Sequence, residues 1–197
     1  MSGAHQAFRR DLVRMRASAV PSHLSDPARR VSIMAGWVVF KHQLHIHHNA
    51  EDTFIWPKLR ERLATSEAAM SVLGEMDAEH EEIDPLLAAV DTAFDQPEIE
   101  DVAGVLDELI TSISFHLDHE EREAMPMIGE ALSDQEWDEV SGAIRSVGMP
   151  SVAEYVPWLC DGFQDAAAER ILSILPPPVT IAFRQHWKPA YDSVNRW

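Results

Sequence analysis

Residues 45–59 read HIHHNAEDTFIWPKL and combine three histidines with an acidic pair and a proline. A second segment, residues 116–132, reads HLDHEEREAMPMIGEAL and aligns with residues 47–63 at an offset of 69. Both follow the pattern H-x-x-x-E-[DE]-x-x-x-x-P. A single HxxxE is common by chance, whereas two copies with a matching proline are not. The repeat predicts that each half of the molecule supplies an equivalent set of side chains to one site.

Helical periodicity extends on both sides of the two segments, interrupted by proline and small polar residues. Four long helices with short connections are typical of an antiparallel four-helix bundle, so we predict an all-α fold. An acid followed by proline at 26–27 predicts the start of the second helix. Because proline disrupts a helix interior, we expect Pro57 to end or kink that helix. The expected spans are Ser2–Ala19, Asp26–Ile55, Ser66–Phe94 and Pro97–Ala124.

The sequence changes character after Leu132, which divides the chain into a bundle over 1–132 and an extension over 133–197. Ser133 and Glu136 form the pattern of a capping box that opens a fifth helix, expected to end near Gly148. Beyond it the chain is rich in proline and aromatic residues. We expect short helices packed on the bundle, and residues 150–197 also suit a protein partner or self-association.

Helical spacing places the histidines of the repeat in line with apolar residues. Residues four apart share one face, so each HxxxE presents its histidine and glutamate together. Both pairs extend an apolar stripe of the kind that faces a bundle interior. One histidine on each of the other two helices lies in a similar stripe. The candidate metal ligands are therefore His5, His47, Glu51, His80, His116 and Glu120.

A charged glutamate in a protein core costs several kcal/mol or more unless it is paired or bound to a metal. No lysine or arginine occupies these stripes near the glutamates, so a metal is the simplest partner. Four histidines and two carboxylates are too many ligands for one tetrahedral zinc ion. Two ions that share bridging carboxylates would use them all, and mixed imidazole and carboxylate ligation suits iron or manganese. Zinc remains an alternative.

A rival register on the same helix consists of His42, His45 and His48, with Asp52 four residues after His48. The second copy has leucine at the position of His48, so the repeat does not support this register. We expect His42 and His45 to lie on a solvated face, as does His119 on the fourth helix. Carboxylates that hold ligand histidines from outside are common in metal sites. The candidates for such a supporting role are His48, Asp52, Asp77 and Glu121.

The signature of His5, His47-x-x-x-Glu51, His80 and His116-x-x-x-Glu120 resembles the hemerythrin-like (HHE cation-binding) family over residues 1–132. The resemblance implies a four-helix bundle with two non-haem iron ions, often bridged by an oxo or hydroxo group, that meet O2, peroxide or nitric oxide. Oxygen-carrying hemerythrins have HxxxH on the third helix and HxxxxD on the fourth. Here the third helix has Asp84 where the second histidine of HxxxH would stand, four residues after His80. Asp84 is either an additional ligand or, with Pro85, a helix cap.

Composition restricts the possible partners. The chain has 197 residues, a formal charge of −17 and one cysteine. A strongly acidic surface repels nucleic acid and anionic membranes, and one cysteine excludes an intrachain disulfide framework. The opening residues lack an apolar signal core, and the longest apolar run is far shorter than the ~20 residues of a membrane span. We expect a cytoplasmic protein.

Three functions fit these observations. The first is a two-iron protein that binds or senses O2, peroxide or nitric oxide. The second is a detoxifying enzyme of the same kind, most plausibly one that disproportionates peroxide, since a site with one imidazole fewer and more carboxylate suits reaction better than carriage. The third is an iron-storage or purely structural metal bundle. No catalytic residue beyond the metal centre is indicated.

Overall fold

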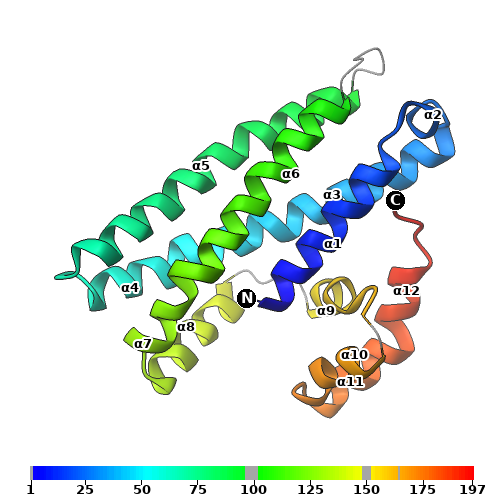
Figure 1. Ribbon diagram of the computed structural model, residues 1–197. Helices are drawn as coiled ribbons and strands as arrows, with labels where there is room; N and C mark the ends of the chain where they lie inside the picture. Colours follow the sequence, from blue (N-terminus) through cyan, green and yellow to red (C-terminus); the bar gives the residue numbers. More distant parts are fainter. Residues whose placement is uncertain (1, 96–101, 148–151, 164) are drawn as a thin grey trace.

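Four long helices run antiparallel in the computed structural model, which describes residues 2–95, 102–147, 152–163 and 165–197 (Figure 1). Side-chain contacts agree with these helix directions. His5 lies against His47 and Phe8 against Phe40, and Glu79 lies against His116. The all-α bundle expected from sequence is confirmed. The helices are α1 (Ser2–Ser18), α3 (Pro27–Ala50), α5 (Glu67–Asp95) and α6 (Val102–His119), with a short α2 (Pro21–Leu24) joining the first two.

Local signals explain where these helices begin. The carboxylate of Asp26 accepts hydrogen bonds from the backbone N–H groups of Ala28 and Arg29, at 2.8 and 3.2 Å, and so caps α3 as expected. The proposed start of the fourth helix at Pro97 lies outside the described residues, and α6 is described from Val102. Helix α5 continues through Pro85 without interruption, so Asp84 does not cap a new segment.

Both ligand-bearing helices continue past the repeat's proline, so the expectation that Pro57 ends its helix is wrong. Helix α3 passes through a π-helical turn, η1 (Glu51–Ile55), into α4 (Trp56–Arg62). Helix α6 does the same through η2 (Glu120–Ala124) into α7 (Met125–Ala131). The N–H of Trp56 bonds to the carbonyl of Glu51, five residues back. This wider turn already breaks the four-residue bonding register, so a proline with no N–H follows at little cost.

The bundle core is built from the apolar stripes found in the sequence. Phe8, Phe40 and Trp37 are fully buried, and Phe8 lies edge-on to Phe40 with ring centroids 5.8 Å apart. Trp37 packs against Phe94 near the far end of α5. The side chains at the opposite end of the same stripes are the histidines and glutamates, which are therefore enclosed by the same packing.

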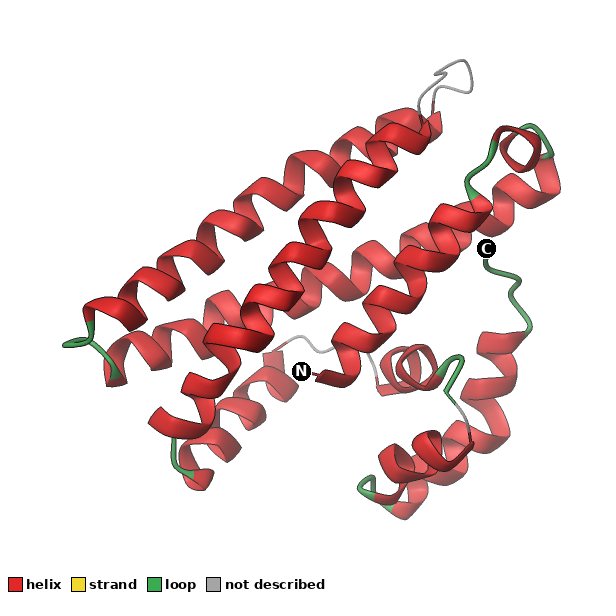
Figure 2. Ribbon diagram, viewed as in Figure 1, coloured by secondary structure: helices red, strands yellow, loops and turns green. Residues whose placement is uncertain are grey.

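The extension consists of shorter helices on one side of the bundle (Figures 1 and 2). Ser133 and Glu136 form the expected capping box, with Ser133 N–H donating to Glu136 Oε2 at 3.0 Å. The helices are α8 (Asp134–Val147), α9 (Val152–Cys160), α10 (Asp165–Ser173), α11 (Pro177–Ala182), the π-helical η3 (Phe183–Trp187) and α12 (Lys188–Asp192). None of the helices described is both long and apolar enough to cross a membrane.

Helix α9 attaches the extension to α1. The indole of Trp158 is fully buried, packs on Phe8 and donates a hydrogen bond of 2.8 Å to the buried carboxylate of Asp11. The guanidinium of Arg10 donates to the carbonyl oxygens of Trp158 and Asp161. Helix α1, which carries His5, thus packs against the other bundle helices on one side and against the extension on the other.

Candidate metal centre

One group of potential ligands joins α1, the end of α3 and the start of η2. Its members are His5, His47, Glu51 and Glu120, whose ligand atoms all lie within 4.8 Å of one another. The Nε2 atoms of His5 and His47 are 3.1 Å apart. His5 Nε2 lies 3.1 Å from Glu120 Oε2, and His47 Nε2 lies 3.1 Å from Glu51 Oε1. These four side chains belong to the six candidate ligands named from the sequence.

A second group consists of three buried histidines, His48, His80 and His116, from α3, α5 and α6. The Nε2 atoms of His80 and His116 are 3.2 Å apart. The ring of His48 stacks on that of His80, with centroids 4.0 Å apart and planes 10° from parallel. It also meets the ring of His116 edge-on at 5.2 Å.

Glu51 lies between the two groups. One of its oxygens, Oε1, is 3.1 Å from His47 Nε2, and the other, Oε2, is 3.6 Å from His80 Nε2. A carboxylate placed in this way can offer one oxygen to an ion in each group. Because Glu51 is the first residue of η1, the π-helical turn begins at the residue that joins the groups; such turns are frequent at functional sites.

The inner atoms of the site lack hydrogen-bond partners. Both oxygens of Glu51, both oxygens of Glu120 and Nε2 of His48 are buried with no partner among the described atoms. Glu51 is 1% exposed and Glu120 fully buried. Burial raises the pKa of the Glu51 carboxyl well above its ordinary value, and the carboxylate of Glu120 raises it further. Burial likewise lowers the pKa of His47 and His48, which favours the neutral form that binds metals.

The spacing of these atoms suits a metal ion. Imidazole nitrogens bind first-row ions at about 2.1 Å, so two ligands at right angles lie roughly 3 Å apart. The measured separations of 3.1 to 3.2 Å within each group match this value. Charge also agrees, because no lysine or arginine among the described residues pairs with Glu51 or Glu120, and a bound cation would neutralise these buried carboxylates.

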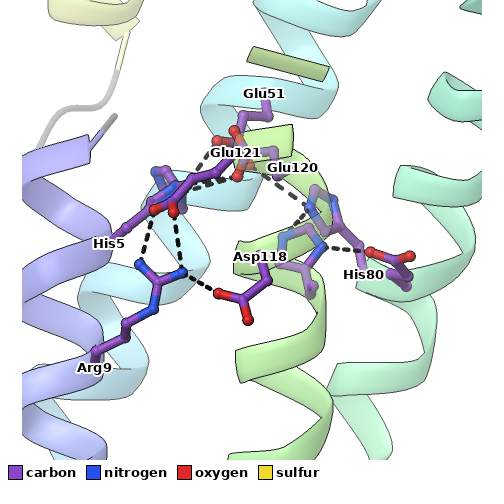
Figure 3. A network of polar contacts seen from close by, with 10 residues as sticks. His5, Arg9, Glu51, His80, Asp118, Glu120 and Glu121 are labelled. Atoms are coloured by element: carbon purple, nitrogen blue, oxygen red, sulfur yellow. Dashed lines mark hydrogen bonds and ion pairs between the residues drawn. The ribbon is translucent and has the colours of Figure 1, made fainter. Parts of the chain in front are cut away.

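Carboxylates outside the site accept hydrogen bonds from one histidine of each group. The Nδ1 of His5 donates to Glu121 at 2.8 Å, and the Nδ1 of His80 donates to Asp52 at 2.8 Å. Glu121 and Asp52 are the equivalent second acids of the two repeat copies, and each accepts a hydrogen bond from a predicted ligand histidine. Each bond fixes the proton on Nδ1 and leaves Nε2 free to face the site. The guanidinium of Arg9 donates a hydrogen bond of 2.8 Å to Glu121. Figure 3 shows it beside that carboxylate.

The structure places three other predicted residues differently. His48 was expected to support ligands from outside, but its ring lies within the second group. Asp77 pairs with Arg60 and does not reach a histidine of the site among the described contacts. Asp84 is exposed and belongs to neither group. His42 and His45 are exposed, as expected.

Sequence reasoning missed the residue that holds His116. Glu79 on α5 accepts from the Nδ1 of His116 at 2.9 Å and from the Nδ1 of His119 at 2.6 Å. His119, expected to be solvated, is buried because this bond turns it inward. The sequence offered no signal for this contact, because the position of Glu79 directly before His80 does not specify which helix its side chain faces.

The family model of the hemerythrin HHE cation binding domain matches residues 1–128. The chain belongs to the hemerythrin HHE family. Searches of curated proteins and of solved structures found no match. The HHE match ends within α7, so it covers every residue of both ligand groups and leaves the extension outside. Family membership and the two groups together identify a cation-binding site in this HHE protein.

Proposed function

We propose that this HHE protein holds two iron ions and binds or reacts with O2, peroxide or nitric oxide. The observation that carries the proposal is the set of fully buried glutamate oxygens without partners, placed among five inward-facing imidazoles. Two ions would occupy the two groups, and Glu51 would serve both. Manganese is the alternative ion with the same preference for imidazole and carboxylate.

In this proposal His48 supplies the fifth imidazole that the third helix lacks. The sequence suggested a site with one histidine fewer than oxygen-carrying hemerythrins. His48, on the second helix, stacks on His80, offers one ring nitrogen to the group, and has an Nε2 without a hydrogen-bond partner. His5 and His47 would hold one ion, and His48, His80 and His116 would hold the other. The two ions would differ in their number of imidazole ligands.

The protein's own contribution is to hold and orient these groups in a dry interior. Asp52, Glu79 and Glu121 fix the proton on Nδ1 of their histidines and raise the basicity of the inward nitrogen. The apolar stripes on either side exclude water. When bound, iron supplies the affinity for small oxygen and nitrogen species and the capacity to exchange electrons with them.

Metal analysis tests the proposal directly. Protein purified without added metal should contain close to two iron or manganese ions per chain. His116→Ala should lose most of this metal, whereas the matched control His42→Ala, at an exposed histidine, should keep it. Fewer than about one ion per chain, with His116→Ala unchanged in fold and colour, would remove the basis for the proposal.

A detoxifying reaction with peroxide is the second candidate, and the outer carboxylates favour it. Three anionic side chains behind the histidines stabilise the more highly charged state of an ion, which suits reaction better than reversible carriage. The visible spectrum with and without peroxide, combined with measurement of evolved O2, separates the two. O2 evolution supports the enzyme. A stable O2 or nitric oxide adduct, with peroxide left untouched, supports the binding protein.

A further inference from the structure

A groove between α3 and α5 leads to the second ligand group. It holds about 390 Å³ and is lined on one side by His45, His48 and Asp52, and on the other by residues of α5 that include His80. Its rim is exposed at His45, and its inner end is the buried ring of His48. Solvent therefore comes close to the site at this point.

The groove is strongly acidic. Four carboxylates line it, and no lysine or arginine does so among the residues that the structure describes: Asp52, Asp77, Glu81 and Asp84. Asp52 is bonded to His80 and Asp77 is paired with Arg60. Glu81 and Asp84 are exposed along the α5 side. A recess lined by one sign of charge concentrates ions of the opposite sign and raises their rate of arrival.

Acids alone do not define a path, but His48 provides a separate observation. It is 8% exposed, lines the groove, and its Nε2 has no hydrogen-bond partner. His45 lies three residues earlier, nearly one helical turn closer to solvent. Two histidines on successive turns thus lead from the rim to the ligand group, which gives a role to the histidine run of residues 45–48.

We propose that this groove is the port through which divalent cations reach the metal centre, with His45 at its mouth and His48 at its inner end. The proposal rests on the proposed function, since a port needs a centre to supply. Cations are favoured over anions because Glu81 and Asp84 repel the latter. The exposed acids attract the ion, and His48 receives it before it passes to the full ligand set.

Loading kinetics of metal-free protein test the port. Chelator-treated protein is mixed with Co²⁺, and the visible absorption of the bound ion is followed in a stopped-flow instrument at low and high salt. Glu81→Gln combined with Asp84→Asn should slow loading by roughly three-fold or more at low salt. Salt should reduce this difference, because it screens exposed charges. The final number of Co²⁺ ions per chain should not change.

Two further variants make the test specific. Glu67→Gln combined with Glu82→Gln removes the same charge from exposed positions of α5 outside the groove, and should load at the wild-type rate. His45→Gln should load more slowly with unchanged final occupancy. Equal rates for the groove and control variants would overturn the port while leaving the centre intact. A wild-type protein that takes up no Co²⁺ would overturn the centre itself.

Discussion

His48 is the residue at which the two halves of the site differ. The repeat aligns it with Leu117, which is fully buried, whereas His48 contributes a ring to the second ligand group. We predict that His48→Leu, which makes the first copy match the second, lowers the metal content from about two ions per chain toward one. Metal analysis measures the change, and His42→Leu is the matched control. Two tightly held ions in His48→Leu would show that the ring only fills space.

Glu51 is the residue whose charge the metal must neutralise. In metal-free protein its raised pKa means that stability is lost as pH rises above the ordinary range of a carboxyl group. We predict that Glu51→Gln stabilises the metal-free protein at neutral pH by roughly 1–3 kcal/mol, because it removes a buried charge without a partner. The advantage should disappear at acid pH, where Glu51 in the wild type is protonated.

With metal bound, the wild type should be more stable than Glu51→Gln. The wild type gains stability from any ion that binds only the folded state, and Glu51→Gln should gain little. Thermal unfolding with chelator and with added Fe²⁺, across a pH series, measures both effects. An unchanged difference between the proteins at acid and neutral pH would contradict the assignment of a buried charge.

The sequence allowed much of the site to be predicted, and the gaps have physical causes. His47, Glu51, His116 and Glu120 could be assigned a buried position because their spacing and the repeat agree. His48 could not, because its position depends on the angle between α3 and α5, which periodicity does not specify. Glu79 holds two histidines of another helix, a contact that no pattern within α5 indicates.

At the level of elements, the two π-helical turns are the feature that the sequence analysis misjudged. The proline was interpreted as a helix end, but in each copy it follows a widened turn that starts at the ligand glutamate. A proline lacks the N–H needed to close a regular turn. The repeated proline thus keeps the turn wide. The wide turn helps to set the position of the glutamate six residues before the proline.

This account predicts the effect of restoring the missing N–H group. Pro57→Ala should allow η1 to tighten toward a regular α-helix, with helical content preserved and Glu51 displaced. We expect a loss of about 10- to 100-fold in metal affinity, the range typical of changes to residues that orient metal ligands. Competition with a coloured chelator measures the affinity, and Pro177→Ala, at the start of α11 outside the bundle, is the control. If Pro57→Ala kept the wild-type metal affinity, the proline would have no effect on the position of Glu51 in the metal site.

At the level of the whole molecule, the extension acts on the site through α1. Ring contacts connect His47 to Phe8 at 5.3 Å and Phe8 to Trp158 at 5.0 Å. The same α1 helix carries His5. The extension therefore braces a ligand-bearing helix that has no HxxxE motif and contributes a single histidine to the site.

Removal of this brace should lower the stability of the protein and weaken its retention of metal. Trp158→Ala should cost about 3–5 kcal/mol, the usual range for a fully buried tryptophan, and should speed the release of metal to a chelator. Trp187→Ala, at a half-buried residue of the extension, should cost less and leave release unchanged. Identical melting temperature and release rate in Trp158→Ala and wild type would mean that the extension and the bundle are independent.

The repeat has a consequence for how such a centre can arise. Each half is a helical hairpin with one histidine on its first helix and HxxxE before a widened turn on its second: His5 with His47 and Glu51, then His80 with His116 and Glu120. A duplicated hairpin would therefore supply six of the seven side chains in the two ligand groups. The seventh, His48, stands where the second copy has Leu117.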